Sequence, residues 1–265
     1  MRFLMKLLLI FIVLTPMTAW ADYTKQIDVF GIPIIATDGV ADSKLLHAAS
    51  VLAEYLDNDQ DGTADDLNVL KALVDNHSFI FMIVGEFEEY TEMPSDVFED
   101  NFYYGFNLYA GEVHPQGSSR TSGFDATLEE VLHLVTHAGY STAYPKQFGV
   151  TPNSDIANAM DKARGGRFMS TPSRYPANAW YTYDDDECEY ECMVTEYFYW
   201  SLTSLLGAQS YGGRASEISR EWKLSSANKL KSKDKQIFQL LSALPIKVIP
   251  KGDYKASALK IKSID

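Results

Sequence analysis

The chain of 265 residues carries 36 acidic against 23 basic side chains, a formal net charge of −13, and two cysteines. This acidity excludes the basic surface of a nucleic-acid-binding protein and disfavours docking on anionic membranes, and two cysteines exclude a small scaffold held by many disulfides. A hydrophobic content of 46% is that of a globular protein with a buried core.

Residues 1–21 predict a secretion signal. Two basic residues precede an apolar run at 7–14, and Ala19-Trp20-Ala21 matches a small-residue cleavage site. The apolar run is short for a membrane-spanning helix. We therefore expect a mature chain of residues 22–265 that forms a single domain, is secreted or periplasmic, and keeps no membrane contact after cleavage.

Hydrophobic periodicity predicts a mixture of strands and helices. Runs rich in β-branched or aromatic residues predict strands at 27–36, 79–84, 102–109 and 246–249. Helical spacing of apolar residues predicts helices at 41–56, 66–74, 125–137, about 156–163, 187–206 and 235–243. Because the two types do not alternate regularly, we expect an α+β fold, with buried helices that carry a metal site packed against a small mixed or antiparallel sheet.

The charges are unevenly distributed along the chain. Residues 22–210 hold 31 acidic and 9 basic residues, whereas residues 211–265 hold 5 acidic and 12 basic residues. The basic residues of this tail alternate with apolar ones. This pattern favours elements that pack against the acidic body over a separate anion-binding arm.

An acidic loop within the helix pair at about 41–75 is a candidate calcium site. Ca²⁺ prefers six to eight oxygen ligands, and aspartates at loop positions 1, 3 and 5 supply three of them. Gly62 stands at position 6, where the chain must turn sharply. The candidate calcium ligands are Asp57, Asp59, Asp61, the carbonyl group of Thr63, and Asp65.

The loop resembles an EF-hand over about twelve residues. Position 12 departs from the EF-hand pattern, because Asn68 stands where a bidentate glutamate is usual. The resemblance therefore implies weak Ca²⁺ binding, suited to the calcium levels outside cells, and a structural role. The alternative is a solvated acidic turn without an ion.

The segment 125–140, DATLEEVLHLVTHAGY, carries the candidate chemistry. His133 and His137 are four residues apart, so a helix projects both imidazoles from one face toward a single metal ion. Glu129 and Glu130 lie one turn earlier, near the same stripe. Apolar residues fill most other positions, which predicts a buried helix whose histidines and glutamates need partners.

This helix resembles the active-site helix of zincin metallopeptidases, in which H-E-x-x-H provides two zinc ligands and a general base. Leu134 follows His133, so the glutamate of that motif is missing. On a helical wheel Glu130 lies about 60° from His133, against about 100° for the zincin glutamate. Glu130 is therefore the candidate base and Glu129 a further ligand. Tyr140, which follows the helix, is a candidate hydrogen-bond donor to an oxyanion.

A third protein ligand is expected. Glu196 lies within the aromatic helix predicted at 187–206, where an unpaired carboxylate is costly, and a glutamate on a second helix resembles the gluzincin arrangement. The loop residue His114 is the other candidate. His47 and His77 are weaker candidates, because His47 on an amphipathic helix is better explained as a packing residue.

With three nitrogen or oxygen ligands, Zn²⁺ is the expected metal, and it would acidify a water molecule for attack on a carbonyl group. One alternative is that the histidines are hydrogen-bonded to the glutamates without a metal. Another is a di-iron carboxylate bundle, suggested by the spacing Glu130-x-x-His133. That fold needs a second such pair, which Glu189-x-x-Cys192 does not supply.

Cys188 and Cys192 are expected to form a local disulfide, because the compartment is oxidising. Their spacing strains a disulfide within a regular helix, so the bridge predicts an irregular helix start at Cys188. Thiolate binding of a metal is the alternative.

Together these patterns predict a secreted zinc-dependent metallohydrolase that is stabilised by Ca²⁺, with peptide hydrolysis as one candidate activity. Its expected partner is a peptide or another small extracellular substrate. A non-catalytic, calcium-dependent surface-binding protein is the alternative, and ligand binding that survives loss of both histidines would favour it.

Overall fold

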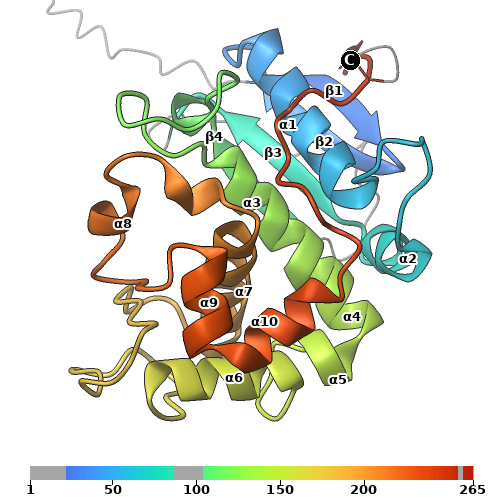
Figure 1. Ribbon diagram of the computed structural model, residues 1–265. Helices are drawn as coiled ribbons and strands as arrows, with labels where there is room; N and C mark the ends of the chain where they lie inside the picture. Colours follow the sequence, from blue (N-terminus) through green and yellow to red (C-terminus); the bar gives the residue numbers. More distant parts are fainter. Residues whose placement is uncertain (1–21, 86–103, 256–258, 265) are drawn as a thin grey trace, which may run out of the picture.

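A mixed sheet and a set of helices form an α+β fold, as predicted (Figure 1). The computed structural model describes residues 22–85, 104–255 and 259–264, so the predicted signal at 1–21 lies outside the described residues. Within them, the strand order is β4-β3-β2-β1-β5. Strand β1 pairs antiparallel with β2 and β5, whereas β3 is parallel to β2 and β4. The strands are β1 (Tyr23–Val29), β2 (Ile32–Thr37), β3 (Phe79–Ile83), β4 (Gly105–Tyr109) and β5 (Lys262–Ser263).

The predicted strand at 27–36 is wrong as a single element, because it spans a β-hairpin. Phe30 and Gly31 both have positive φ, 54° and 87°, and Val29 pairs with Ile32. Left-handed backbone at both central residues is typical of the two-residue turns that match the twist of a hairpin. Apolar residues continue through the turn, and periodicity alone therefore did not reveal it.

The predicted helices are all present within one or two turns of their expected bounds. The α-helices are α1 (Asp42–Leu56), α2 (Leu67–Asp75), α3 (Thr127–Leu134), α4 (Ser141–Ala143), α5 (Pro145–Phe148), α6 (Asp155–Arg164), α7 (Tyr190–Leu205), α8 (Arg214–Glu217), α9 (Ala227–Lys233) and α10 (Lys235–Ser242). Helix α3 continues directly into a π-helical turn, Val135–Tyr140, and 3-10 turns are formed by Ala110–Glu112 and Ala208–Ser210.

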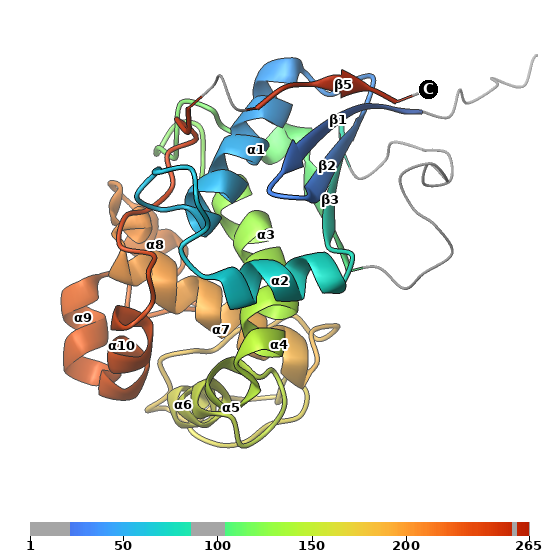
Figure 2. The same cartoon turned by 90° about the vertical axis from the view of Figure 1, so that its right-hand side faces the viewer.

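Helix α3 runs through the middle of the molecule, between the sheet and the helical lobe (Figures 1 and 2). It contacts α1, β3 and β4 on one side and α7 on the other. Its apolar residues on nearly all faces, such as Val131, Leu132 and Leu134, are fully buried, which is the position expected for a helix without a polar face. Adjacent residues of β2 lie on opposite faces of the sheet: Ile34 packs in the main core and Ile35 in a smaller cluster.

A buried contact between His47 and Asp125 ties the chain before α3 to helix α1. His47 Nε2 lies 2.7 Å from Asp125 Oδ2, and both side chains are almost fully buried. The other oxygen of Asp125 accepts the backbone N–H groups of His114 and Thr127. Burial raises the pKa of Asp125, but the hydrogen bond and charge of His47 outweigh burial and hold this pKa below its usual value. His47 is thus a partnered packing residue, in line with its interpretation from the sequence.

The C-terminal tail packs against the acidic body, but the strand predicted at 246–249 is wrong. The side-chain oxygen of Asn58 accepts the N–H groups of Lys247 and Val248, and its amide nitrogen donates to the carbonyl of Val248. Glu54 accepts three further N–H groups, from residues 251, 253 and 254. Side chains of α1 and the acidic loop therefore form hydrogen bonds with the backbone of the tail. The tail's backbone groups need no neighbouring strand as a partner.

None of the helices in the described part of the chain has both the length and the apolarity needed to cross a bilayer.

Removing the carboxylate of Asp125 will test its role in positioning α3. Asp125→Ala leaves His47 buried without its partner, and we expect the free energy of unfolding to fall by about 3 kcal/mol. Because the pKa of Asp125 is lower in the folded than in the unfolded chain, its contribution is complete above the unfolded pKa and is lost as the pH falls through the folded pKa. Urea titration measures both effects.

The exposed Asp38→Ala is the matched control and should change stability by less than about 0.5 kcal/mol. A loss below about 1 kcal/mol in Asp125→Ala would contradict the assigned role.

Candidate metal centre

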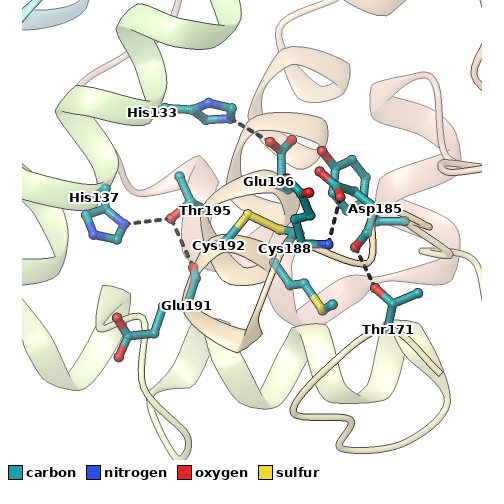
Figure 3. The surroundings of a disulfide bond; sticks show 12 residues. His133, His137, Thr171, Asp185, Cys188, Glu191, Cys192, Thr195 and Glu196 are labelled. Atoms are coloured by element: carbon teal, nitrogen blue, oxygen red, sulfur yellow. Dashed lines mark hydrogen bonds and ion pairs between the residues drawn. A yellow bond between two sulfur atoms is a disulfide. The ribbon is translucent and has the colours of Figure 1, made fainter. Parts of the chain in front are cut away.

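Two helices bring one histidine and two glutamates together. Glu129 and His133 come from α3 and Glu196 from α7, and one ligand atom of each lies within 4.8 Å of the others. His133 Nε2 is 3.6 Å from Glu196 Oε1. Figure 3 shows the imidazole of His133 pointing across to the carboxylate of Glu196. The structure therefore assembles three of the predicted metal ligands.

Two polar atoms of this cluster are buried without a hydrogen-bond partner. His133 is 5% and Glu196 8% exposed, and neither His133 Nε2 nor Glu196 Oε2 has a hydrogen-bond partner. An unsatisfied buried polar atom costs about 1–3 kcal/mol, and more when it is charged. Two such atoms on neighbouring side chains indicate a site where a bound ion would satisfy both.

Glu130 lies on the other side of the His133 ring. Its carboxylate is 3.6 Å from Nδ1 of His133, and its side chain is 32% exposed. A carboxylate beside the second ring nitrogen orients a metal-binding histidine and raises its basicity. The sequence predicts Glu130 as a general base, but this placement suits it better to holding His133 in position.

The two carboxylates control the protonation of His133. Burial lowers the pKa of the imidazole, but the charges of Glu196 and Glu130 outweigh burial and raise the pKa well above its usual value. Burial, followed by the charge of Glu196, raises the pKa of Glu129 to about 8. Without an ion, the cluster therefore holds protons at neutral pH, which a metal would have to displace.

His137 lies in the same cleft but outside this cluster. Its Nδ1 is 3.0 Å from Thr195 Oγ1, and that hydroxyl donates to the carbonyl of Glu191 at 3.1 Å. Since the hydroxyl proton is committed to Glu191, Thr195 accepts the proton on Nδ1, and Nε2 of His137 is left unprotonated. Figure 3 shows His137 opposite Thr195, as His133 is opposite Glu196. Burial lowers the pKa of His137, which favours the neutral ring.

The π-helical turn that carries His137 is pressed against α2. A Cβ atom on Gly139 would lie 2.9 Å from a methyl carbon of Val69 and 3.1 Å from Leu73. Glycine is therefore required for this close approach. Turns of π-helix inside α-helices are frequent at functional sites. This one extends the candidate metal helix and packs against α2, the helix that follows the acidic loop.

A cleft of about 970 Å³ opens onto the cluster. His133 and His137 line it from one helix, and Thr195 and Glu196 line it from α7. Phe106 of β4 forms part of the wall, and its ring centroid lies 6.2 Å from that of His133 and 6.1 Å from that of His137. Sequence reasoning missed Thr195 and Phe106, because no spacing in the sequence connects either residue to His137.

Tyr140 and His114 lie elsewhere. Tyr140 is 2% exposed, and its ring packs against Phe148 and Phe198 with centroids 5.4 Å and 6.0 Å away. The backbone N–H of His114 donates to Asp125, and a Cβ on Gly123 would be 3.9 Å from its Nε2. Within the described residues, neither side chain belongs to the cleft lining or to the cluster, so neither serves the role predicted for it.

The acidic loop gathers the aspartates predicted to bind calcium. One oxygen each from Asp57, Asp59 and Asp61 lies within 4.8 Å of the others, and Asp57 is fully buried. Asp57 Oδ2 accepts the N–H of Gly62 at 2.8 Å and the hydroxyl of Tyr254 at 2.5 Å. Gly62 has φ of 100°, as the sharp turn requires.

The rest of the loop follows the expected positions only in part. Thr63 donates its N–H to Asp61, and Asp65 accepts the N–H of Asn58. Burial raises the pKa of Asp65, and the neighbouring aspartate charges raise it further. Asn68, at the departing position, donates its amide to Tyr144, so its side chain does not close the loop as a bidentate glutamate would.

The predicted disulfide is confirmed at the edge of the cleft. Cys188 and Cys192 are bonded, with Cα atoms 5.4 Å apart. Helix α7 begins at Tyr190, so Cys188 precedes the regular helix, as the spacing required. The bond anchors the first turn of the helix that carries Thr195 and Glu196 (Figure 3).

Zn²⁺ binding to the purified protein should release protons. Glu129, with its pKa raised to about 8, and His133 are both protonated in the ion-free protein at pH 7, and a ligand must lose its proton. Calorimetry in buffers of different ionisation enthalpy should detect at least about one proton released per ion. Below pH 8, the zinc affinity should rise about tenfold per pH unit for each proton released. Glu129→Gln should reduce the release, whereas pH-independent affinity would contradict the assignment.

Comparisons of the chain with protein-family models, with characterised proteins and with solved structures found no match. The chemistry of the site therefore has to be inferred from its own geometry.

Proposed function

We propose that this protein is an extracytoplasmic, zinc-dependent hydrolase whose metal is held by Glu129, His133 and Glu196. The observation that carries the proposal is that His133 Nε2 and Glu196 Oε2 are buried without a hydrogen-bond partner. The two side chains meet in the lining of an open cleft, with His133 Nε2 3.6 Å from Glu196 Oε1. A structural role alone would leave both atoms unsatisfied. An ion between them would offset the cost of burying a carboxylate and an imidazole.

Zinc fits the donor set. One imidazole nitrogen and two carboxylate oxygens are borderline and hard ligands, and a zinc site with three protein ligands keeps a further position for water or substrate. When bound, zinc would supply a Lewis acid and an acidified water molecule at the cleft. Glu130, beside Nδ1, would hold the ring of His133 in the orientation that presents Nε2 to the ion.

His137 is the side chain best placed to accept a proton. Its Nε2 is free of the proton because Nδ1 donates to Thr195, and burial keeps the ring neutral near pH 7. A general base requires an unprotonated atom in the cleft with a pKa near the working pH. We therefore assign the base to His137 instead of Glu130, and give Thr195 the role of fixing the ring's tautomer.

A peptide is the substrate class that the cleft favours. Phe106 and Asn107 of β4 line the cleft, and β4 is the last strand of the sheet on that side among the described residues. The edge of a sheet offers backbone N–H and C=O groups with which an extended peptide can pair. This arrangement would place a peptide bond beside the proposed metal.

A calcium ion in the acidic loop would stabilise the scaffold. Asp57, Asp59 and Asp61 repel one another when ionised, and a hard cation would offset that repulsion. The same loop holds the C-terminal tail through the Tyr254 hydroxyl and the side chain of Asn58. Ca²⁺ would thus stiffen the junction between α1, α2 and the tail. The disulfide fits an oxidising compartment for this activity.

Metal content and peptide hydrolysis will test the main proposal. We expect one zinc per chain. Glu130→Gln, which removes a partner of a ligand, should lower the zinc affinity by about 10–100-fold. Glu196→Gln, which removes a ligand, should lower it further. His137→Ala should keep the zinc and slow hydrolysis by about 10²–10⁴-fold. Elemental analysis and a mixed peptide library measure the two effects.

His114→Ala is the matched control, since this histidine lies outside the cleft lining, and it should change neither quantity. A purified protein without stoichiometric transition metal, whose metal content is unchanged by His133→Ala, would refute the proposal. If calcium still stabilised such a protein, the non-catalytic calcium-dependent binding protein would take its place.

Thermal unfolding will test the calcium loop separately. At a Ca²⁺ concentration about 100 times the dissociation constant, binding should add about 2.7 kcal/mol to the free energy of unfolding, which raises Tm by roughly 5–10 °C. Asp59→Asn and Asp61→Asn together should abolish the shift, whereas the exposed Asp38→Asn should retain it. An unchanged Tm in millimolar Ca²⁺ would assign the loop to a solvated acidic turn.

A further inference from the structure

The cleft beside the proposed metal is rich in acidic side chains. Its lining includes five glutamates and no lysine or arginine among the described residues. Two of them already have a role at the proposed metal: Glu196 is a proposed ligand, and Glu130 lies beside Nδ1 of His133. The other three, Glu187, Glu189 and Glu191, are exposed on the segment that leads into α7 and on its first turn. This excess lies inside the cleft, so it is distinct from the chain's overall acidity.

The disulfide holds this acidic segment in place. Glu189 and Glu191 lie between the bonded Cys188 and Cys192, and the N–H of Glu187 donates to Asp185 Oδ1 at 2.9 Å. Figure 3 shows the side chain of Glu191 extended beside His137. Because the cross-link already fixes this short turn at the cleft, little conformational entropy of the turn is lost when a ligand binds its carboxylates.

In the part of the chain that the structure describes, none of these three glutamates forms an ion pair with lysine or arginine. A single divalent ion would offset only part of the charge of five carboxylates. A cleft lined by one sign of charge focuses the field and raises the local concentration of oppositely charged ligands by 10–10³-fold.

The cleft also offers apolar surface to the stem of a long cationic side chain. Met169 is 57% exposed in the lining, and Phe106 forms part of the wall near the histidines. Lysine and arginine bury their methylene groups on such surfaces and keep the charged end among polar groups. A bare ion would use the carboxylates but would have no need of this apolar surface.

We propose that the cleft selects peptides that carry a lysine or arginine side chain close to the bond presented to the metal. This inference rests on the proposed hydrolase function and defines its substrate class. Glu187, Glu189 and Glu191 are the specificity residues, and they act by attracting the cationic end of the side chain. They take no part in the proton transfer assigned to His137.

Binding of matched peptides to the zinc-loaded full chain will test the proposal without requiring turnover. Two peptides differ only in lysine or glutamine at one central position, and their Kd values are measured by calorimetry at low and high salt. We expect the lysine peptide to bind at least about tenfold more tightly at low salt, with the ratio falling toward one in high salt.

The triple variant Glu187→Gln, Glu189→Gln and Glu191→Gln should also bring the ratio close to one. The triple variant Asp38→Asn, Asp42→Asn and Asp75→Asn removes the same charge from exposed positions outside the cleft lining and should retain the ratio. Because the salt series uses the unaltered protein, it supplies a result even if a variant fails to fold.

Equal affinity for the two peptides in low salt would overturn the inference, even if zinc content and hydrolysis agree with the proposed function. A lysine preference that the cleft triple variant retains would also overturn it, because the charge would then lie elsewhere. A preference that the cleft variant abolishes, in a protein that holds no zinc, would support the acidic cleft as a site for cationic side chains while refuting the hydrolase.

Discussion

The burial of an imidazole between carboxylates, at the contact of two helices, is the constraint on which the rest of this structure depends. His133 on α3 faces Glu196 on α7 at 3.6 Å, and both are nearly inaccessible to water. Charged or polar atoms in such a place are costly unless something satisfies them. The fold accepts this cost where α3 meets α7, which is why that point is the candidate site.

The surroundings of α3 hold this costly arrangement in position. The hydroxyl of Tyr55 in α1 donates to the carbonyl of Leu128 at 2.8 Å, and the pair of His47 with Asp125 anchors the chain just before the helix. On another side, Gly139 allows α2 to approach the π-helical turn. The acidic loop connects α1 to α2, so any ion bound there would stiffen the supports of the site from a distance.

Most elements could be predicted from the sequence, because the spacing of apolar residues along a helix or strand reflects which of its faces is buried. The errors occurred where local pattern and tertiary context conflict. Apolar residues ran through the hairpin turn at Phe30 and Gly31, and residues 246–249 looked like a strand although their backbone is satisfied by Asn58. In both cases the hydrogen-bond partner, and not the side-chain pattern, decided the local structure.

The sequence by itself determined that the two histidines lie on one buried helix, that acidic residues gather in a turn between helices, and that the cysteines are close enough to bond. These are consequences of spacing within single elements, which local geometry decides. Only the tertiary structure decided that Glu196 meets His133, that Thr195 meets His137, and that Tyr140 turns away into an aromatic cluster. The reason is physical: such contacts depend on how α7 packs against α3, and no periodicity within either helix encodes that relation.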